Sequence, residues 1–129
     1  MSKDWYQDIV DFHEQVMKDN FLKRPHIPEG KLKRLRIELI IEEVARELLP
    51  AMRTDDLVKI ADGIGDSIVV LIGAAITYGI DIRPIWDEIH RTNMLKKDGD
   101  TRADGKKLKP KGWKPPEIEK IIKEQQNVR

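Results

Sequence analysis

The feature that most constrains the fold is a run of apolar residues, as long as a helix, between residues 60 and 78. Its polar side chains are few: Asp62, Asp66, Ser67, Thr77 and Tyr78. A helix that is apolar almost all the way round is typical of a segment buried on every side. An unpaired ionised carboxylate in such a place costs several kcal/mol, so Asp62 and Asp66 require neutralising partners.

Helical spacing of apolar residues predicts three more helices, over 4–21, 31–52 and 84–94. Pro25, Pro28 and Gly30 separate the first two of these helices. Thr54 to Asp56 offers N-caps for the apolar helix 60–78, and Gly79 ends that helix. Residues 95–116 lack helical periodicity, and 117–129 favour a last polar helix or a tail. We therefore expect one all-α domain over 1–129, a bundle of four to five helices with its helical core in 1–94.

Charge and composition exclude several classes of protein. With 24 basic and 23 acidic side chains the net charge is +1, so the whole chain is not built to coat nucleic acid. Eight basic and three acidic residues between 96 and 114 make that segment locally basic. Because cysteine is absent, zinc-thiolate sites and thiolate nucleophiles are excluded. The most apolar stretch, 67–80, is about fourteen residues, too short to span a membrane, and we expect a cytoplasmic protein.

Four acidic residues form two pairs with helical spacing. Glu43 and Glu47 are four residues apart, and so are Asp62 and Asp66, so each pair projects from one helix face. The residues allow three ways to neutralise them: a salt bridge from another helix, protonation, or divalent cations between the pairs. Oxygen-only ligands favour Mg²⁺, with Mn²⁺ as the alternative.

Several segments together resemble a known family. These are RIELIIEEVAREL at 36–48, IADGIGDSIVVLIGAA at 60–75, GIDI at 79–82, DEIHRTNMLK at 87–96, RADGKKLKP at 102–110 and WKPP at 113–116. In order and spacing they resemble the MazG-like all-α nucleoside triphosphate pyrophosphohydrolases, and most closely the phage and bacterial branch called phosphoribosyl-ATP pyrophosphohydrolase-like. The resemblance implies Mg²⁺-dependent hydrolysis of a nucleoside triphosphate, expected to be a deoxynucleotide, to the monophosphate and pyrophosphate.

The resemblance also implies roles for residues. The family signature is E-x-x-E on one helix and E-x-x-D on the next. Here Arg46 and Gly63 stand where two of the acids are expected, with Glu47 and Asp62 beside them. The implied metal ligands are Glu43, Glu47, Asp62 and Asp66, and Glu42 is the implied catalytic base. The implied substrate-binding residues are Asn93, Lys96, Arg102, Lys106 and Lys107.

Rival functions remain open at this point. Phosphoribosyl-ATP hydrolysis is the closest, and a non-catalytic nucleotide- or protein-binding module is favoured by Arg46, which would repel a cation. Nucleic-acid binding by the basic segment is a third and weaker hypothesis. Because helix 60–78 is too apolar for so small a domain to cover, we expect a homodimer or homotetramer, in the host cytoplasm if the gene is carried by a phage.

Overall fold

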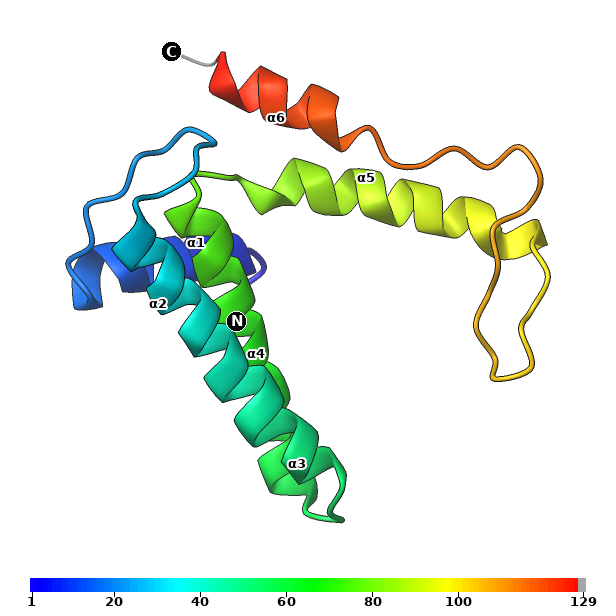
Figure 1. Cartoon of the computed structure of the whole chain (residues 1–129), viewed down its shortest axis with the longest axis horizontal. Coiled ribbons are helices and arrows are strands. Elements are labelled where there is room, and N and C mark those ends of the chain that lie inside the picture. Colours follow the sequence, from blue (N-terminus) through cyan, green and yellow to red (C-terminus); the bar gives the residue numbers. More distant parts are fainter. Residues whose placement is uncertain (128–129) are drawn as a thin grey trace. The chain divides into compact units, whose positions relative to one another are not determined.

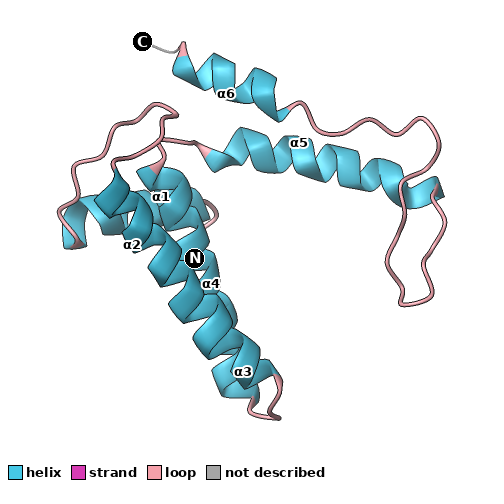
Figure 2. Cartoon of the chain, viewed as in Figure 1, coloured by secondary structure: helices cyan, strands magenta, loops and turns pink. Residues whose placement is uncertain are grey.

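The computed structural model describes residues 1–127, which are helices and loops (Figure 2). The elements follow one another as α1 (Trp5–Asp11), η1 (Phe12–Val16), α2 (Gly30–Ile40), η2 (Ile41–Leu48), α3 (Leu49–Met52), α4 (Leu57–Thr77), α5 (Ile82–Met94), η3 (Leu95–Asp98) and α6 (Ile118–Gln126). Here η1 and η2 are π-helical and η3 is a 3₁₀ turn. An all-α fold is thus confirmed, while the single domain stays a prediction because the chain forms two compact units, Met1–Asp81 and one that begins at Ile82.

The first unit is built on two long helical rods packed side by side (Figure 1). One rod runs without interruption through α2, η2 and α3, and the other is α4. Only residues 53–56 join them, so the rods are antiparallel. Gly63 allows their close approach, because a Cβ added there would lie 3.3 Å from Leu48 Cα. This seam between the rods holds the acidic residues described below.

Short polar side chains determine where the helices start. The Asp4 carboxylate accepts a hydrogen bond from the Gln7 backbone N–H at 3.0 Å, and Asp56 accepts one from Lys59 at 3.1 Å. Such N-caps satisfy backbone donors that have no partner within the helix. The cap at Asp56 lies in the segment where the sequence predicted one.

Two expectations about helices were wrong. The first helical segment ends at Val16 rather than 21, and α4 is not buried on all sides: Leu57, Ile64 and Leu71 are exposed. The first unit has too few other helices to cover every face of α4 along its whole length. In the second unit, Ile85 is buried, but Trp86 beside it is 68% exposed.

The whole of α4 is long and apolar enough to cross a membrane by length and composition. The sequence argument considered only a shorter stretch of it. Core helices of soluble proteins meet the same criterion, and 28% of the apolar window of α4 is buried in the structure. The helix packs along α2, and it carries Asp62 and Asp66 in its N-terminal half.

The second unit pairs α5 with α6 and places a closed loop between them. The segment predicted to be irregular contains η3 and then a tight hairpin-like loop. In this loop Arg102 N–H donates to Lys106 O at 2.7 Å, and Thr101 and Lys107 form an isolated antiparallel bridge. The last polar helix is confirmed as α6, and the end of the predicted range, 128–129, lies outside the described residues.

Candidate metal centre

Three of the predicted metal ligands come together in the seam of the first unit. One carboxylate oxygen from each of Glu43, Glu47 and Asp66 lies within 4.8 Å of the other two. Glu43 and Glu47 come from η2, and Asp66 comes from the facing turn of α4. The two antiparallel rods therefore bring together side chains about twenty residues apart in sequence, as expected for ligands shared between two helices.

The Glu43 carboxyl shows the electrostatic cost of this arrangement. Partial burial, a hydrogen bond with Glu47 and the negative charges of Glu47, Asp66 and Glu42 raise its pKa. One of its oxygens, Oε2, is buried and has no hydrogen-bond partner within the described part of the chain. Clustered carboxylates with an unpartnered buried oxygen fit a divalent cation, because a hard cation would satisfy the oxygen and offset the repulsion.

The structure also explains the two departures from the family signature. Arg46 is well exposed and lies 3.9 Å from Glu38, so its guanidinium is paired outside the cluster while Glu47 takes part in it. Gly63 faces the backbone of Leu48, and a Cβ there would lie 3.2 Å from Leu48 Cδ1 and 3.3 Å from Leu48 Cα, so that Leu48 would have to shift slightly. The group of three carboxylates therefore forms in spite of both departures.

Two predicted residues do not belong to that group. Asp62 lies on α4 one turn before Asp66, and Glu42 is exposed beside Glu43. Glu42 is still close enough for its charge to act on Glu43. The metal role of Asp62 and the catalytic role of Glu42 stay predictions.

The predicted substrate-binding residues all belong to the second unit. Lys96 Nζ donates to Asn93 Oδ1 at 3.0 Å, and both line an open pocket of about 410 Å³ with Lys107. Met94 and Lys97 complete its lining, so it holds three lysines and no carboxylate. This is an electrostatic environment suited to phosphate oxygens.

Arg102 and Lys106 belong to the neighbouring hairpin-like loop. Arg102 Nε donates to Asp104 Oδ1 at 2.8 Å, and the Lys106 backbone N–H donates to the same oxygen at 3.2 Å. The guanidinium is thus engaged in holding the loop. The side chain of Asp104 organises the turn that presents these basic residues.

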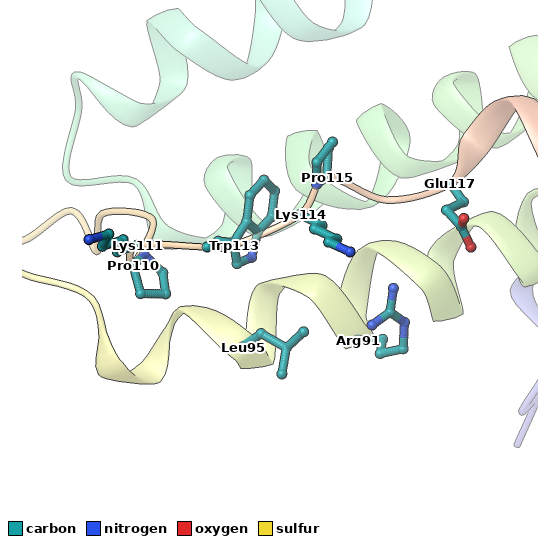
Figure 3. Close-up of a pocket in the computed structure, with 9 residues that line it drawn as sticks. Arg91, Leu95, Pro110, Lys111, Trp113, Lys114, Pro115 and Glu117 are labelled. Carbon is teal, nitrogen blue, oxygen red and sulfur yellow. The ribbon is translucent and has the colours of Figure 1, made fainter.

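Trp113 packs where the loop returns toward α5 (Figure 3). Its indole Nε1–H donates to the Thr92 carbonyl at 2.7 Å, and the Nζ atoms of Lys96 and Lys109 lie 5.1 and 4.8 Å from the ring centroid. Contacts of this kind anchor an aromatic side chain. Trp113 therefore holds the basic segment on α5.

A polar cluster that the sequence did not reveal lies further along the same seam of the first unit. His13 and Arg36 are only 3% and 5% exposed. His13 Nδ1 lies 3.1 Å from Asp19 Oδ2, and Arg36 Nη2 lies 3.6 Å from the same oxygen. Burial and the nearby Arg36 charge lower the pKa of His13, so its ring is neutral at pH 7 and donates from Nδ1. Isolated in the sequence, His13 gives no sign of these partners.

Comparison with known protein families agrees with this geometry. The family described as phosphoribosyl-ATP pyrophosphohydrolase matches residues 10–93. The chain belongs to this family. Curated proteins compared with the chain give no match. The matched range includes η2 and α4, which carry the acidic cluster, and ends at Asn93.

Membership of this family confirms the predicted MazG-like superfamily. It makes the protein a hydrolase with activity of the nucleotide pyrophosphohydrolase type. Members of the family depend on metal ions in general, and the three carboxylates supply oxygen ligands for such an ion.

Metal binding is expected to stabilise the fold. At a metal concentration 100 times Kd, Mg²⁺ or Mn²⁺ should raise the free energy of unfolding by about 2.7 kcal/mol, measured as a shift in Tm with and without EDTA. Glu43→Gln should reduce this shift while leaving the metal-free protein at least as stable as wild type, because it removes one of the repelling charges. An equal shift in both proteins would contradict metal binding by Glu43.

The pH dependence has a definite sign. Since the pKa of Glu43 is raised on folding, the folded protein keeps this proton at pH values where the unfolded chain has lost it. Without metal, the Glu43 contribution to stability therefore decreases as pH rises through the window above 4.5. The stabilisation by metal should increase over the same window, because protons and metal compete for the carboxylate.

Proposed function

We propose that the protein is a Mg²⁺-dependent nucleoside triphosphate pyrophosphohydrolase that converts a triphosphate, expected to be a deoxynucleotide, and water to the monophosphate and pyrophosphate. The observation that carries the proposal is the group of Glu43, Glu47 and Asp66 on two facing helices, in a chain of this family. Three carboxylates repel a triphosphate unless cations lie between them. Mg²⁺ suits such oxygen ligands, with Mn²⁺ as the alternative.

The metal, when bound, neutralises phosphate charge and polarises the phosphorus and the attacking water. Glu43, Glu47 and Asp66 would hold it at the seam. Glu42, exposed next to Glu43, is proposed to accept the proton of the attacking water. The water oxygen forms a bond to the α-phosphorus, the bond to the β-phosphate leaving group breaks, and pyrophosphate departs.

Asn93, Lys96 and Lys107 are proposed to bind phosphate oxygens of the substrate, with Arg102 and Lys106 contributing from the loop. Three lysines in an open pocket without a carboxylate support this role. Because Lys96 already donates to Asn93, its ammonium is held in place before substrate arrives.

We also propose a homodimer or homotetramer in the cytoplasm, or in the host cytoplasm for a phage gene. Exposed apolar side chains along the two rods support a second copy of the chain as their cover: Leu32, Leu35, Ile37, Leu57, Ile64 and Leu71. Sedimentation of the purified protein is expected to give at least twice the monomer mass of 15.0 kDa. A monomer at micromolar concentration would contradict this proposal.

Two rival functions have different standing. The family description names phosphoribosyl-ATP, which is the rival substrate. The hypothesis of a non-catalytic binding module rested on Arg46. The guanidinium of this residue pairs with Glu38 instead, and three carboxylates still come together. Comparing kcat/KM for deoxynucleoside triphosphates and phosphoribosyl-ATP tests the substrate. A higher value for phosphoribosyl-ATP would overturn the triphosphate proposal while keeping the reaction type.

A further inference from the structure

The tryptophan of the basic segment, Trp113, has contacts that anchoring alone does not require. The Nζ atoms of two lysines lie near its ring, that of Lys96 at 5.1 Å and that of Lys109 at 4.8 Å from the centroid. Lys96 also lines the open pocket of about 410 Å³, here called the lysine pocket, whereas Lys109 does not. One ring thus joins the returning loop to an ammonium group of the lysine pocket.

Lys96 is held more firmly than the other two lysines of this pocket. It is half-buried, while Lys97 and Lys107 are exposed. Its Nζ donates to Asn93 Oδ1 at 3.0 Å, and the face of the Trp113 ring attracts the ammonium through the ring quadrupole. Both contacts offset the repulsion that three ammonium groups in one pocket exert on each other.

The position of the ring is itself fixed by hydrogen bonds between residues distant in sequence. The indole Nε1–H of Trp113 donates to the Thr92 carbonyl, 21 residues away, at 2.7 Å. Thr92 lies in the last turn of α5, where carbonyls have no partner within the helix. Further along, the Glu117 backbone N–H donates to Glu88 Oε2 at 2.7 Å, so α5 holds the returning chain at two points. The two bonds fix the ring relative to α5 and to Lys96, which follows that helix.

Resting on the proposed function, we propose that Trp113 is a positioning residue for the phosphates of the substrate. It acts through Lys96, whose ammonium it holds in the lysine pocket by the cation–π contact. Trp113 gives no hydrogen bond to phosphate, because its indole N–H is engaged with Thr92. A lysine held in place loses less side-chain freedom when an anion binds than a mobile lysine does, so it binds the anion more tightly.

The test measures anion binding apart from turnover, by titration calorimetry with inorganic tripolyphosphate in EDTA at low salt. Without Mg²⁺ the acidic cluster does not bind an anion, and at low salt charge contacts are screened least. Three backgrounds are compared with and without Trp113→Leu: wild type, Lys96→Gln and Lys109→Gln. Trp86→Leu is the matched control, because Trp86 is exposed on α5 and does not line the pocket. Circular dichroism and Tm confirm that each variant is folded.

We expect Trp113→Leu to weaken tripolyphosphate binding at least about threefold in wild type and in Lys109→Gln, but less than about twofold in Lys96→Gln. Trp86→Leu should leave the binding unchanged. In turnover, Trp113→Leu should raise KM for the triphosphate by a similar factor with kcat little changed. An equal loss in all three backgrounds would overturn the proposal, as would a lower kcat at unchanged KM or no tripolyphosphate binding by wild type.

A measurement on the intact tryptophan keeps the test usable if Trp113→Leu does not fold. The nuclear magnetic resonance signal of the Trp113 indole N–H, identified by its loss in Trp113→Phe, should shift when wild type binds tripolyphosphate. Lys96→Gln should abolish this shift, and Lys109→Gln should keep it. The same shift in Lys96→Gln as in wild type would contradict the role of Trp113. Absence of pyrophosphate release by wild type would contradict the proposed function instead, because the binding measurements do not depend on turnover.

Discussion

Asp66→Asn is expected to lower metal-dependent pyrophosphate release at least about a hundredfold, with little change in the fold. Asp66 is the residue of α4 whose carboxylate lies within 4.8 Å of those of Glu43 and Glu47. The amide has nearly the same shape but loses the charge that holds a divalent cation between the rods. Initial rates at saturating Mg²⁺, together with the Tm response to metal, measure the effect.

Asp62→Asn provides the matched control for this prediction. It makes the same chemical change one turn earlier on the same helix, at a carboxylate outside the group of three. We expect a smaller loss than for Asp66→Asn. Equal losses would show that Asp62 is a ligand of comparable importance, and full activity in Asp66→Asn would contradict the proposed metal centre.

Gly79→Ala is expected to lower the free energy of unfolding by roughly 4 kcal/mol. Gly79 has a φ of 70°, a conformation that favours glycine, and an added Cβ would collide with the backbone carbonyl of Arg24. The same contact region includes the hydrogen bond from the His26 N–H to the Tyr78 carbonyl at 2.9 Å. The substitution therefore separates the loop before α2 from the end of α4.

Gly112→Ala measures the cost of backbone strain separately from the cost of steric collision. Gly112 also has a positive φ, of 80°, but an added Cβ there meets open space. Chemical denaturation of both variants should show a loss of about 1–2 kcal/mol for Gly112→Ala, from backbone strain alone. If Gly79→Ala lowers the free energy of unfolding by no more than this, the loop before α2 does not pack against the end of α4 as described.

Helical periodicity was sufficient to predict most of the elements, because amphipathic spacing and proline or glycine interruptions act locally. The lengths were less predictable. The first helical segment is shorter than its apolar pattern, and eight residues from Ile41 to Leu48 adopt π-helical turns. The apolar spacing of this segment fits an ordinary α-helix and carries no signal for these turns.

The acidic site was likewise predicted only in part. Spacing of four residues predicted that Glu43 and Glu47 share a face, and the family resemblance pointed to both Asp62 and Asp66 as their partners. Which of Asp62 and Asp66 joins the glutamates depends on the register of two antiparallel helices, and this register is a property of packing. Gly63, against the Leu48 backbone, is one residue that allows the close approach of the two helices.

The polar cluster of the first unit was beyond sequence reasoning for a different reason. His13, Asp19 and Arg36 come from η1, the following loop and α2, and no motif joins them. An isolated histidine is most simply interpreted as a structural residue. Only the fold shows that it shares the Asp19 carboxylate with a buried arginine.

The most direct test of the central claim is product analysis of the intact protein with a panel of ribo- and deoxynucleoside triphosphates, in Mg²⁺ and in EDTA. We predict equal amounts of pyrophosphate and nucleoside monophosphate from at least one triphosphate in Mg²⁺, and none in EDTA. Release of orthophosphate and a diphosphate, or no cleavage of any triphosphate by the folded protein, would contradict it.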